Sequence, residues 1–478
     1  MNHKTPENQK KLKYFMPKLS SSPKISTFTL VMITVIAVDS LKSIPISAQY
    51  GFSLVFYYLL ATLVFLIPSA LVSAELASSL PKTGGLYIWI REAFGDKWAS
   101  FVIWLQWIYN ICWYPTILAL LAASLVYPFA PWLVDNKFYM LFTILGLYWI
   151  TTWINIQGIQ ASAILSRFTA LIGTIFPMAA ISGLAFYWVQ QGNSPVITFS
   201  IDTFIPELDK TDNWIFLSSI LYSLLGMEIT AYHAQDVANP AKNFPHAIFY
   251  SVIIILTSII FSSLAVAIVI PEKTLKSNLI SGMLDAFNIF FSTMGLSYLL
   301  PVVCILIVIG SLGSVGAWLI GPSKGLMIAA EDGHLPAFLA KKNSKGAPQN
   351  ILIIQGLIFS ILSTAYIFMP NVNSAFFILS ILTTQLALFG YIFMFLAVVK
   401  LRLYRPNLKR PFRIPFGKLG LYLVAASGIL SCSIAILFSF LPPDDIAVGN
   451  YLNYELMLMG SFVLFILAIY KLSSTRLS

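Results

Sequence analysis

Long apolar runs recur along the whole chain, and they constrain its fold more than any other feature. Hydrophobic residues make up 58% of the 478-residue sequence and charged residues only 10%, whereas about a quarter of a typical soluble domain is charged. A helix needs about 20 apolar residues to cross the hydrocarbon core of a bilayer. The sequence therefore predicts an all-α polytopic membrane protein.

We expect twelve membrane spans. They lie near residues 27–48, 53–78, 98–126, 138–156, 162–189, 213–236, 245–270, 294–328, 350–369, 375–399, 418–440 and 452–471. The first run is too long for the core of a signal peptide and has no clear cleavage site, so we interpret it as a retained span. Span 8 is too long for one straight crossing, and we expect part of it to bend or to extend into the cytosol.

Basic residues gather on one side of the membrane in this arrangement. Of the 29 lysines and arginines, 24 lie on the N-terminal side, and the opposite side holds Lys137, Lys210, Lys273 and Lys276. Because basic loops stay in the cytoplasm, both termini are expected there, in a bacterial inner membrane. The same asymmetry accounts for the net charge of +10 without a nucleic-acid partner. The basic stretch 400–413 either fixes this topology or contacts anionic lipid.

The sequence contains no recognisable arrangement of enzyme residues. It has no serine–histidine–aspartate arrangement, no H-x-x-x-H, no phosphate loop and no redox pair, and its three cysteines are far apart. We therefore expect neither an enzyme nor a metal or cofactor site. The expected cytoplasmic loops are too short for an ATPase domain, which leaves secondary transport.

The stretch "VIAVDSLKSIPISA" (35–48) places two opposite charges inside span 1. From Lys24 to Val38 the apolar run covers about 22 Å of helix, which is short of the roughly 30 Å core. Apolar residues then resume at Ile44, and Pro45 disfavours helix just before it. Asp39 and Lys42 therefore mark the interruption between two half-helices of one span.

Span 6 shows a similar interruption at Gly226 and Glu228. Close helix packing would also explain the glycine, but its position beside an intramembrane carboxylate favours an unwound segment. If spans 1–5 and 6–10 are two repeats, the broken helix comes first in each, and the second repeat has inverted topology. Paired interruptions of this kind indicate the midplane binding site of a transporter. Glu75 is a further charged residue inside a span, near the cytoplasmic end of span 2. A functional role is one interpretation of this intramembrane charge, and a structural hydrogen-bonding role is the alternative.

Three motifs resemble the amino acid–polyamine–organocation transporters, and within them the glutamate:γ-aminobutyrate antiporter-like group. They are "YGFSLVFYYLLATLVFLIPSALVSAELASSLPKTGGLYIWIREAFG" (50–95), "LLGMEITAYHAQDVANPAKNFPHA" (224–247) and "GAWLIGPSKGLMIAAEDGHLP" (316–336). The resemblance covers essentially the whole chain. It implies a leucine-transporter-type fold of five plus five helices in inverted repeats, two accessory helices, and alternating access to an amino acid or its decarboxylation product.

This fold divides the chain into seven parts. They are a cytoplasmic tail (1–26), the first five-helix repeat (27–189), an extracytoplasmic loop (190–212), the inverted repeat (213–399), a basic cytoplasmic loop (400–417), two accessory helices (418–471) and a C-terminal tail (472–478). A long tail that plugs the vestibule in this group has no counterpart here, so acid gating by a plug is not carried over. The break "AVDSLKSIP" also differs from the group's, which leaves the substrate open.

The resemblance also implies roles for single residues. Gly226 and Glu228 match the family's G-x-E at the span 6 break, and Tyr222 matches a gating aromatic. Asn110 resembles a polar position of span 3 that lies near the substrate in this family. Trp318 resembles an aromatic position of span 8 near the same site, and packing in the core or against lipid is the alternative for this tryptophan.

Together these arguments predict a substrate site at the two breaks. The expected substrate-binding residues are Asp39, Ser40, Lys42, Asn110, Tyr222, Ser223, Gly226 and Trp318, and the expected coupling or gating residues are Lys42, Glu228 and His233. Lys42 would bind a second anionic group of the substrate, stand in for a sodium ion, or pair with Asp39 on one helix face. Glu228 is a coupling or gating residue, with a scaffold role as its alternative.

The predicted function is secondary active transport of amino acids by an antiporter or a proton-coupled permease. A nutrient sensor with a transporter fold and a polyamine or amine exchanger are the alternatives. The expected partners are a small amino acid or amine, membrane lipid, protons and a second copy of the chain in a homodimer.

Overall fold

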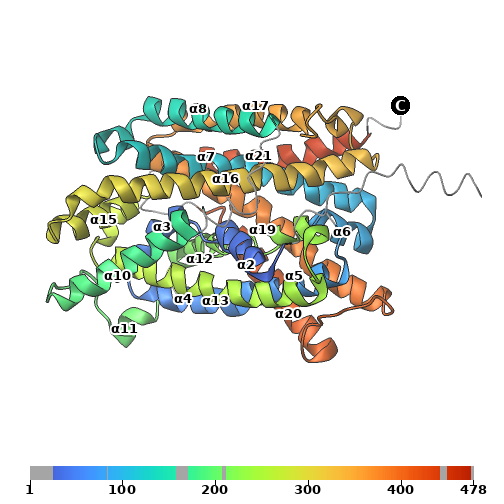
Figure 1. Ribbon diagram of the computed structural model, residues 1–478, viewed down its shortest axis with the longest axis horizontal. Helices are drawn as coiled ribbons and strands as arrows, with labels where there is room; N and C mark the ends of the chain where they lie inside the picture. The colour runs from blue at the N-terminus through green and yellow to red at the C-terminus, as the bar shows by residue number, and fades with distance from the viewer. Residues whose placement is uncertain are drawn as a thin grey trace, which may run out of the picture.

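The computed structural model is a bundle of helices, and it describes residues 25–82, 84–157, 169, 171–206, 211–441 and 449–474. Within these residues the only β-structure is an isolated bridge between Ile25 and Val237, at the start of span 1 and the end of span 6. α6 (Leu86–Phe94) lies at one end of the bundle, and α11 (Ile201–Phe204) and α15 (Gly282–Thr293) lie at the other (Figure 1).

The long helices run between these two ends. They are α7 (Asp96–Val126), α8 (Lys137–Ile156), α10 (Phe176–Gln190), α13 (Pro240–Ala267), α16 (Leu300–Glu331), α17 (Gln349–Ser363), α19 (Val372–Tyr404), α20 (Gly417–Phe438) and α21 (Tyr451–Ser474). Span 2 combines α4 (Ser53–Ala61), the π-helix η2 (Thr62–Leu66) and α5 (Ile67–Ser79). Short elements complete the chain: η3 (Pro131–Asp135), η4 (Leu171–Ile175), α14 (Glu272–Ser277), η6 (Ser297–Leu299), η7 (Ala337–Ala340) and α18 (Ala365–Phe368).

Within the described residues, ten helices are long and apolar enough to cross a membrane, which agrees with a polytopic membrane protein. They correspond to predicted spans 1–5 and 7–11. Predicted span 6 is too strongly interrupted to count as one helix, and predicted span 12 coincides with α21. The total of twelve spans and the inverted repeat therefore stay predictions. Predicted span 8 is the continuous 32-residue helix α16, with Pro322 inside it.

α7 is the central helix of the bundle. It packs against α16 and α19 and also contacts α6, α8 and α17. In the most apolar 18-residue stretch of α7, 94% of the residues are buried, whereas the share in α8 is 28%. Large apolar side chains such as Leu423 and Leu437 on α20 instead face outward. The surface of a soluble protein would carry many charged side chains at such positions. This outer surface therefore fits a lipid environment.

Span 1 is broken as predicted. α2 (Thr27–Val38) ends in two extended residues, Asp39 and Ser40, and the chain continues as the 3₁₀ turn η1 (Leu41–Ser43) and α3 (Ile44–Ala48). Pro45 lies in the first turn of α3, where its missing N–H costs no helical hydrogen bond.

Span 6 is broken at the predicted place as well. α12 (Thr211–Ser223) stops before Gly226, and the 3₁₀ helix η5 (Ile229–Asp236) follows Glu228. Gly226 has φ +120°, which side-chain-bearing residues rarely adopt. A Cβ atom there would lie 3.0 Å from the carbonyl oxygen of Ala37. The glycine therefore lets the two breaks touch.

Glu75 has a structural position at the α6 end of the bundle. Its carboxylate accepts hydrogen bonds from Arg402 Nε at 2.9 Å and from the backbone N–H of Ile414 at 2.8 Å. Arg410 Nε lies 3.4 Å from Glu75 Oε1. This buried carboxylate therefore holds the basic loop after α19 against span 2.

Candidate substrate site

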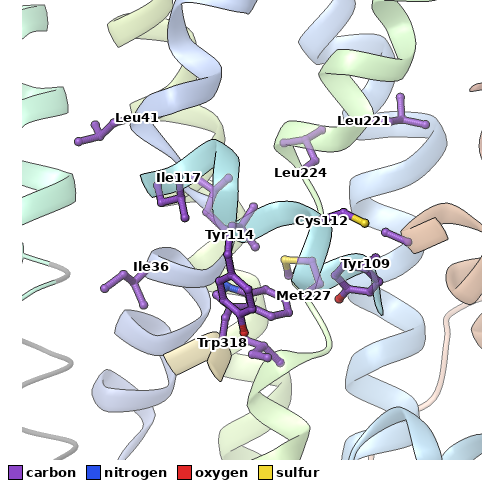
Figure 2. Close-up of a cluster of buried hydrophobic side chains, with 14 of the residues drawn as sticks. Ile36, Leu41, Tyr109, Cys112, Tyr114, Ile117, Leu221, Leu224, Met227 and Trp318 are labelled. Carbon is purple, nitrogen blue, oxygen red and sulfur yellow. The ribbon is translucent and has the colours of Figure 1, made fainter. Parts of the chain in front are cut away.

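A small cavity lies between the two breaks and α7, α16 and α19. Its volume is about 30 Å³, roughly the space of one water molecule. It is lined by Ala37, Val38, Ser40, Lys42, Ser43, Tyr109, Asn110, Trp113, Tyr222, Leu225, Trp318 and Thr383. Tyr109 and Trp318 lie among the buried side chains of this region (Figure 2), with their ring centroids 6.2 Å apart. The structure therefore shows the site closed and too small for an amino acid.

Lys42 supplies the charge of this cavity. Its side chain is 2% exposed, and its Nζ donates to Thr116 Oγ1 at 2.8 Å and to the Tyr222 hydroxyl. The ammonium also lies 4.3 Å from the ring centroid of Tyr222 and 5.6 Å from that of Trp113. Among the residues that the structure describes, no carboxylate forms an ion pair with Lys42. Among the described residues, the hydrogen-bond partners of this buried amino group are thus both neutral.

Three other polar groups of the cavity have no hydrogen-bond partner among the described residues. They are Ser40 Oγ, Asn110 Oδ1 and Trp318 Nε1, and all three atoms are buried. The Asn110 amide nitrogen is used within α7, where it donates to the Gln106 carbonyl at 2.7 Å. Buried polar groups are nearly always paired. A hydroxyl, an amide acceptor and an indole donor around one cavity therefore fit a polar ligand.

Asp39 does not line the cavity in this structure, and its predicted role in substrate binding stays a prediction. Its Oδ2 lies 2.7 Å from Ser258 Oγ of α13, and no ion pair joins it to Lys42 in the described structure. Residues three apart share a face only in a helix. The extended backbone at Asp39 and Ser40 turns the two charges to opposite sides of the break.

Glu228 lies beyond the cavity in a cluster of hydroxyl and amide groups. Its Oε1 accepts from Gln106 Nε2 at 3.2 Å and from the Tyr109 hydroxyl at 3.3 Å. Its Oε2 accepts from the Tyr391 hydroxyl, which also accepts from the backbone N–H of Gly226 at 2.8 Å. The carboxylate therefore ties the span 6 break to α7 and α19.

The structure brings five predicted substrate residues together around the cavity: Ser40, Lys42, Asn110, Tyr222 and Trp318. Gly226 shapes the break without lining the cavity, and the Ser223 hydroxyl donates to the Ile220 carbonyl at 2.7 Å. The side chain of His233 lies outside the described part of the structure, so its predicted coupling role stays a prediction.

Sequence reasoning missed Trp113, Thr116 and Tyr391. Trp113 and Thr116 follow Asn110 at intervals of three residues on α7, and that spacing could have placed them on the same helix face. Tyr391 gives no such signal, because it is one aromatic residue among many in the long apolar helix α19.

Comparison with known proteins gives one family for almost the whole chain. The family model "Amino acid permease" matches residues 25–462. An uncharacterized transporter of Legionella pneumophila is 45% identical, over 93% of this chain and 96% of its own length. A glutamate/gamma-aminobutyrate antiporter of Lactococcus lactis is 29% identical, over 92% and 88%. A probable agmatine/putrescine antiporter of the same species is 25% identical, over 88% of each chain.

Proposed function

Because the chain belongs to the amino acid permease family, we propose that it is a secondary active transporter of amino acids that works by alternating access at the bilayer midplane. The two broken spans support this mechanism, since they meet at the closed cavity. Breaks in corresponding spans are where such transporters bind their substrates. The antiporters among its relatives support exchange as the mode of transport.

One observation carries the choice of substrate: the buried ammonium of Lys42 has only neutral partners. A buried charge without a counter-ion is costly, and an ammonium has three hydrogens to donate. Two of them go to Thr116 and Tyr222. A carboxylate of the substrate supplies the missing negative charge and accepts the remaining hydrogen bond.

The three unpaired groups complete the proposed binding mode. Trp318 Nε1 donates to the substrate carboxylate, while Asn110 Oδ1 and the Ser40 hydroxyl accept from its amino group. Because the closed cavity is smaller than an amino acid, Lys42 and the half-helices of the two breaks move apart when substrate enters.

Relatives named as polyamine transporters make a polyamine exchanger the second candidate. Lys42 disfavours it, because a polyamine would bring further positive charge to a cavity whose lysine has no ion-pair partner among the described residues. A sensor without net transport has no specific contact in its favour. We place the protein in a bacterial inner membrane with both termini in the cytoplasm, on the basis of its basic loops.

Counterflow in proteoliposomes tests this proposal. Liposomes that contain the purified protein are loaded with one unlabelled compound, and entry of the same labelled compound is followed. We expect stimulated exchange for one or more carboxylate-bearing amino acids and none for putrescine. Exchange of putrescine alone would favour the polyamine reading. Ligand-dependent thermal stabilisation without any exchange would favour a sensor.

A further inference from the structure

A second polar site lies on the opposite side of the span 1 break. Asp39 is 3% exposed and faces α13, away from the cavity. Its Oδ1 is buried and has no hydrogen-bond partner in the described part of the chain. From this geometry we propose that Asp39 is a proton-binding site, loaded and unloaded as the transporter changes conformation. The inference rests on the proposed transport function and adds the ion that drives it.

The hydrogen bonds of Ser258 are compatible with Asp39 in either protonation state. Ser258 Oγ lies 2.7 Å from Asp39 Oδ2, 2.7 Å from the Ile254 carbonyl and 3.0 Å from the Ile255 carbonyl. A hydroxyl has one hydrogen to donate. If Ser258 donates it to a carbonyl of its own helix, the short contact with Asp39 needs a proton on the carboxyl group. If Ser258 donates to Asp39, the carboxyl group is ionised.

The same positions of the heavy atoms thus serve both protonation states. Loading takes a proton from water that reaches the opened site, forms an O–H bond on Asp39 and turns the Ser258 hydroxyl to the Ile254 carbonyl. Unloading returns the proton to water and turns the Ser258 hydroxyl back to Asp39. Asp39, Ser258 and α13 can keep their heavy-atom positions in both protonation states, while the conformational change of the transporter gives this buried site its access to water.

Glu228 offers an instructive contrast. Both of its oxygens accept hydrogen bonds, from Gln106, Tyr109 and Tyr391. The side-chain oxygen Oε1 of Gln106 in turn accepts from the Tyr232 hydroxyl, so the side-chain nitrogen of Gln106 is directed at the carboxylate. Donors on both oxygens favour an ionised group. In Asp39, Oδ2 contacts a hydroxyl that can donate or accept, and Oδ1 accepts no hydrogen bond from the described residues. Asp39 is therefore the better proton carrier of the two.

Several titratable groups lie on the elements packed around the break. They include Tyr58 of α4, Tyr109 and Cys112 of α7, Tyr222 of α12, Glu228 after α12, Tyr232 of η5, and His246 and Tyr250 of α13, with Lys42 on the break itself. Tyr58 interacts electrostatically with Asp39 and hydrogen-bonds Ser47 at 2.7 Å. Tyr109 and Glu228 bind each other. No cation pairs with Asp39 among the described residues, so a proton is the available way to neutralise it.

Charge balance links this proton to the substrate. With the cavity empty, Asp39 forms no ion pair with Lys42 among the described residues, but its ionised form keeps the net charge of the break at zero. When a carboxylate of the substrate neutralises Lys42, the charge of Asp39 is left over, and binding of a proton removes it. Proton and substrate therefore bind with positive cooperativity, and thermodynamic linkage makes the effect reciprocal.

The test compares the wild type with the Asp39→Asn variant in proteoliposomes. We use an amino acid that shows counterflow and a pH-sensitive dye trapped inside. In the wild type, an inwardly directed gradient of one pH unit should accumulate the amino acid about tenfold per coupled proton, and the dye should report proton entry. Asp39→Asn should retain exchange at equal pH but lose both pH-driven accumulation and proton entry.

Ser258→Ala is the companion variant. It removes the hydroxyl partner but keeps the carboxyl group, so it should shift the pH dependence of exchange and keep proton entry. Proton entry that persists in Asp39→Asn, or accumulation that follows a sodium gradient instead of a pH gradient, would overturn the proposal.

An infrared difference spectrum between acidic and alkaline pH tests the site without transport. Of the carbonyl bands of protonated carboxyl groups, one component should be present in the wild type and in Glu228→Gln and missing in Asp39→Asn, while the bands of the other carboxyl groups stay unchanged. A band that disappears in Glu228→Gln and persists in Asp39→Asn would overturn the assignment. Because this spectrum needs no transport, a failed counterflow assay would refute the proposed function without deciding the protonation of Asp39.

Discussion

At the scale of single residues, Lys42 is the group that most determines what the cavity can bind. Replacing Lys42 by Met keeps much of its volume and removes the charge. Because a hydrogen bond to a charged group contributes about 1.5–3 kcal/mol, the affinity for a carboxylate-bearing substrate should fall roughly 10- to 100-fold. A scintillation proximity assay with purified protein measures this affinity directly.

Lys82→Met is the matched control, because Lys82 is exposed and pairs with Glu92 at 3.3 Å, far from the cavity in the fold. This control should bind like the wild type. Equal affinity of Lys42→Met and the wild type would show that the ammonium has no part in substrate recognition.

Sequence reasoning found the charged residues of the breaks but not their directions. Asp39 and Lys42 stand out because a charge in a membrane span is costly. Whether they pair depends on two backbone ψ angles, 115° at Asp39 and 113° at Ser40, and no pattern of residue types encodes these. Thr116 was missed for a related reason, since a threonine in an apolar helix normally bonds its own backbone.

At the scale of elements, Glu75 fixes span 2 to the end of α19 and the loop that follows. Its side chain is 2% exposed, and those of Arg402 and Arg410 are 14% and 3% exposed. Removing one partner of a buried ion pair leaves the others uncompensated and costs about 3–5 kcal/mol. Glu75→Gln should therefore clearly lower the melting temperature in detergent.

Glu331→Gln provides the comparison for this prediction. Glu331 pairs with Lys342 at 2.7 Å, but both side chains are more than 40% exposed. An exposed pair contributes about 0–1 kcal/mol, so the melting temperature should hardly change. Equal melting temperatures of the two variants would show that the Glu75 cluster does not hold the loop.

The elements themselves were largely predictable. Apolar runs of the right length fixed most of the spans, because crossing the hydrocarbon core sets a minimum length. The breaks were found where polar residues interrupt such runs. The 3₁₀ form of η5 was not predictable, because the segment after Glu228 carries no strong helix-stop signal before Asn239 and Pro240.

At the scale of the whole molecule, the account requires that the cavity between the two breaks faces each side of the membrane in turn. The structure shows one closed arrangement, in which Gly226 and Ala37 touch and the cavity has room for about one water molecule. Substrate passage therefore needs the contact between the two breaks to open toward one side and then the other. Composition and span lengths predicted the bundle, but no sequence signal could predict which state the structure adopts.

The most direct measurement of this claim is the accessibility of a cysteine at the cavity wall. The native Cys112, Cys304 and Cys432 are buried and are replaced by alanine, and Ser40→Cys is introduced. A membrane-impermeant thiol reagent is then applied to proteoliposomes from outside or inside, with and without an amino acid that shows counterflow. We predict labelling from both sides, with substrate changing the ratio between them. Labelling from one side alone, unaffected by substrate, would contradict alternating access at this cavity.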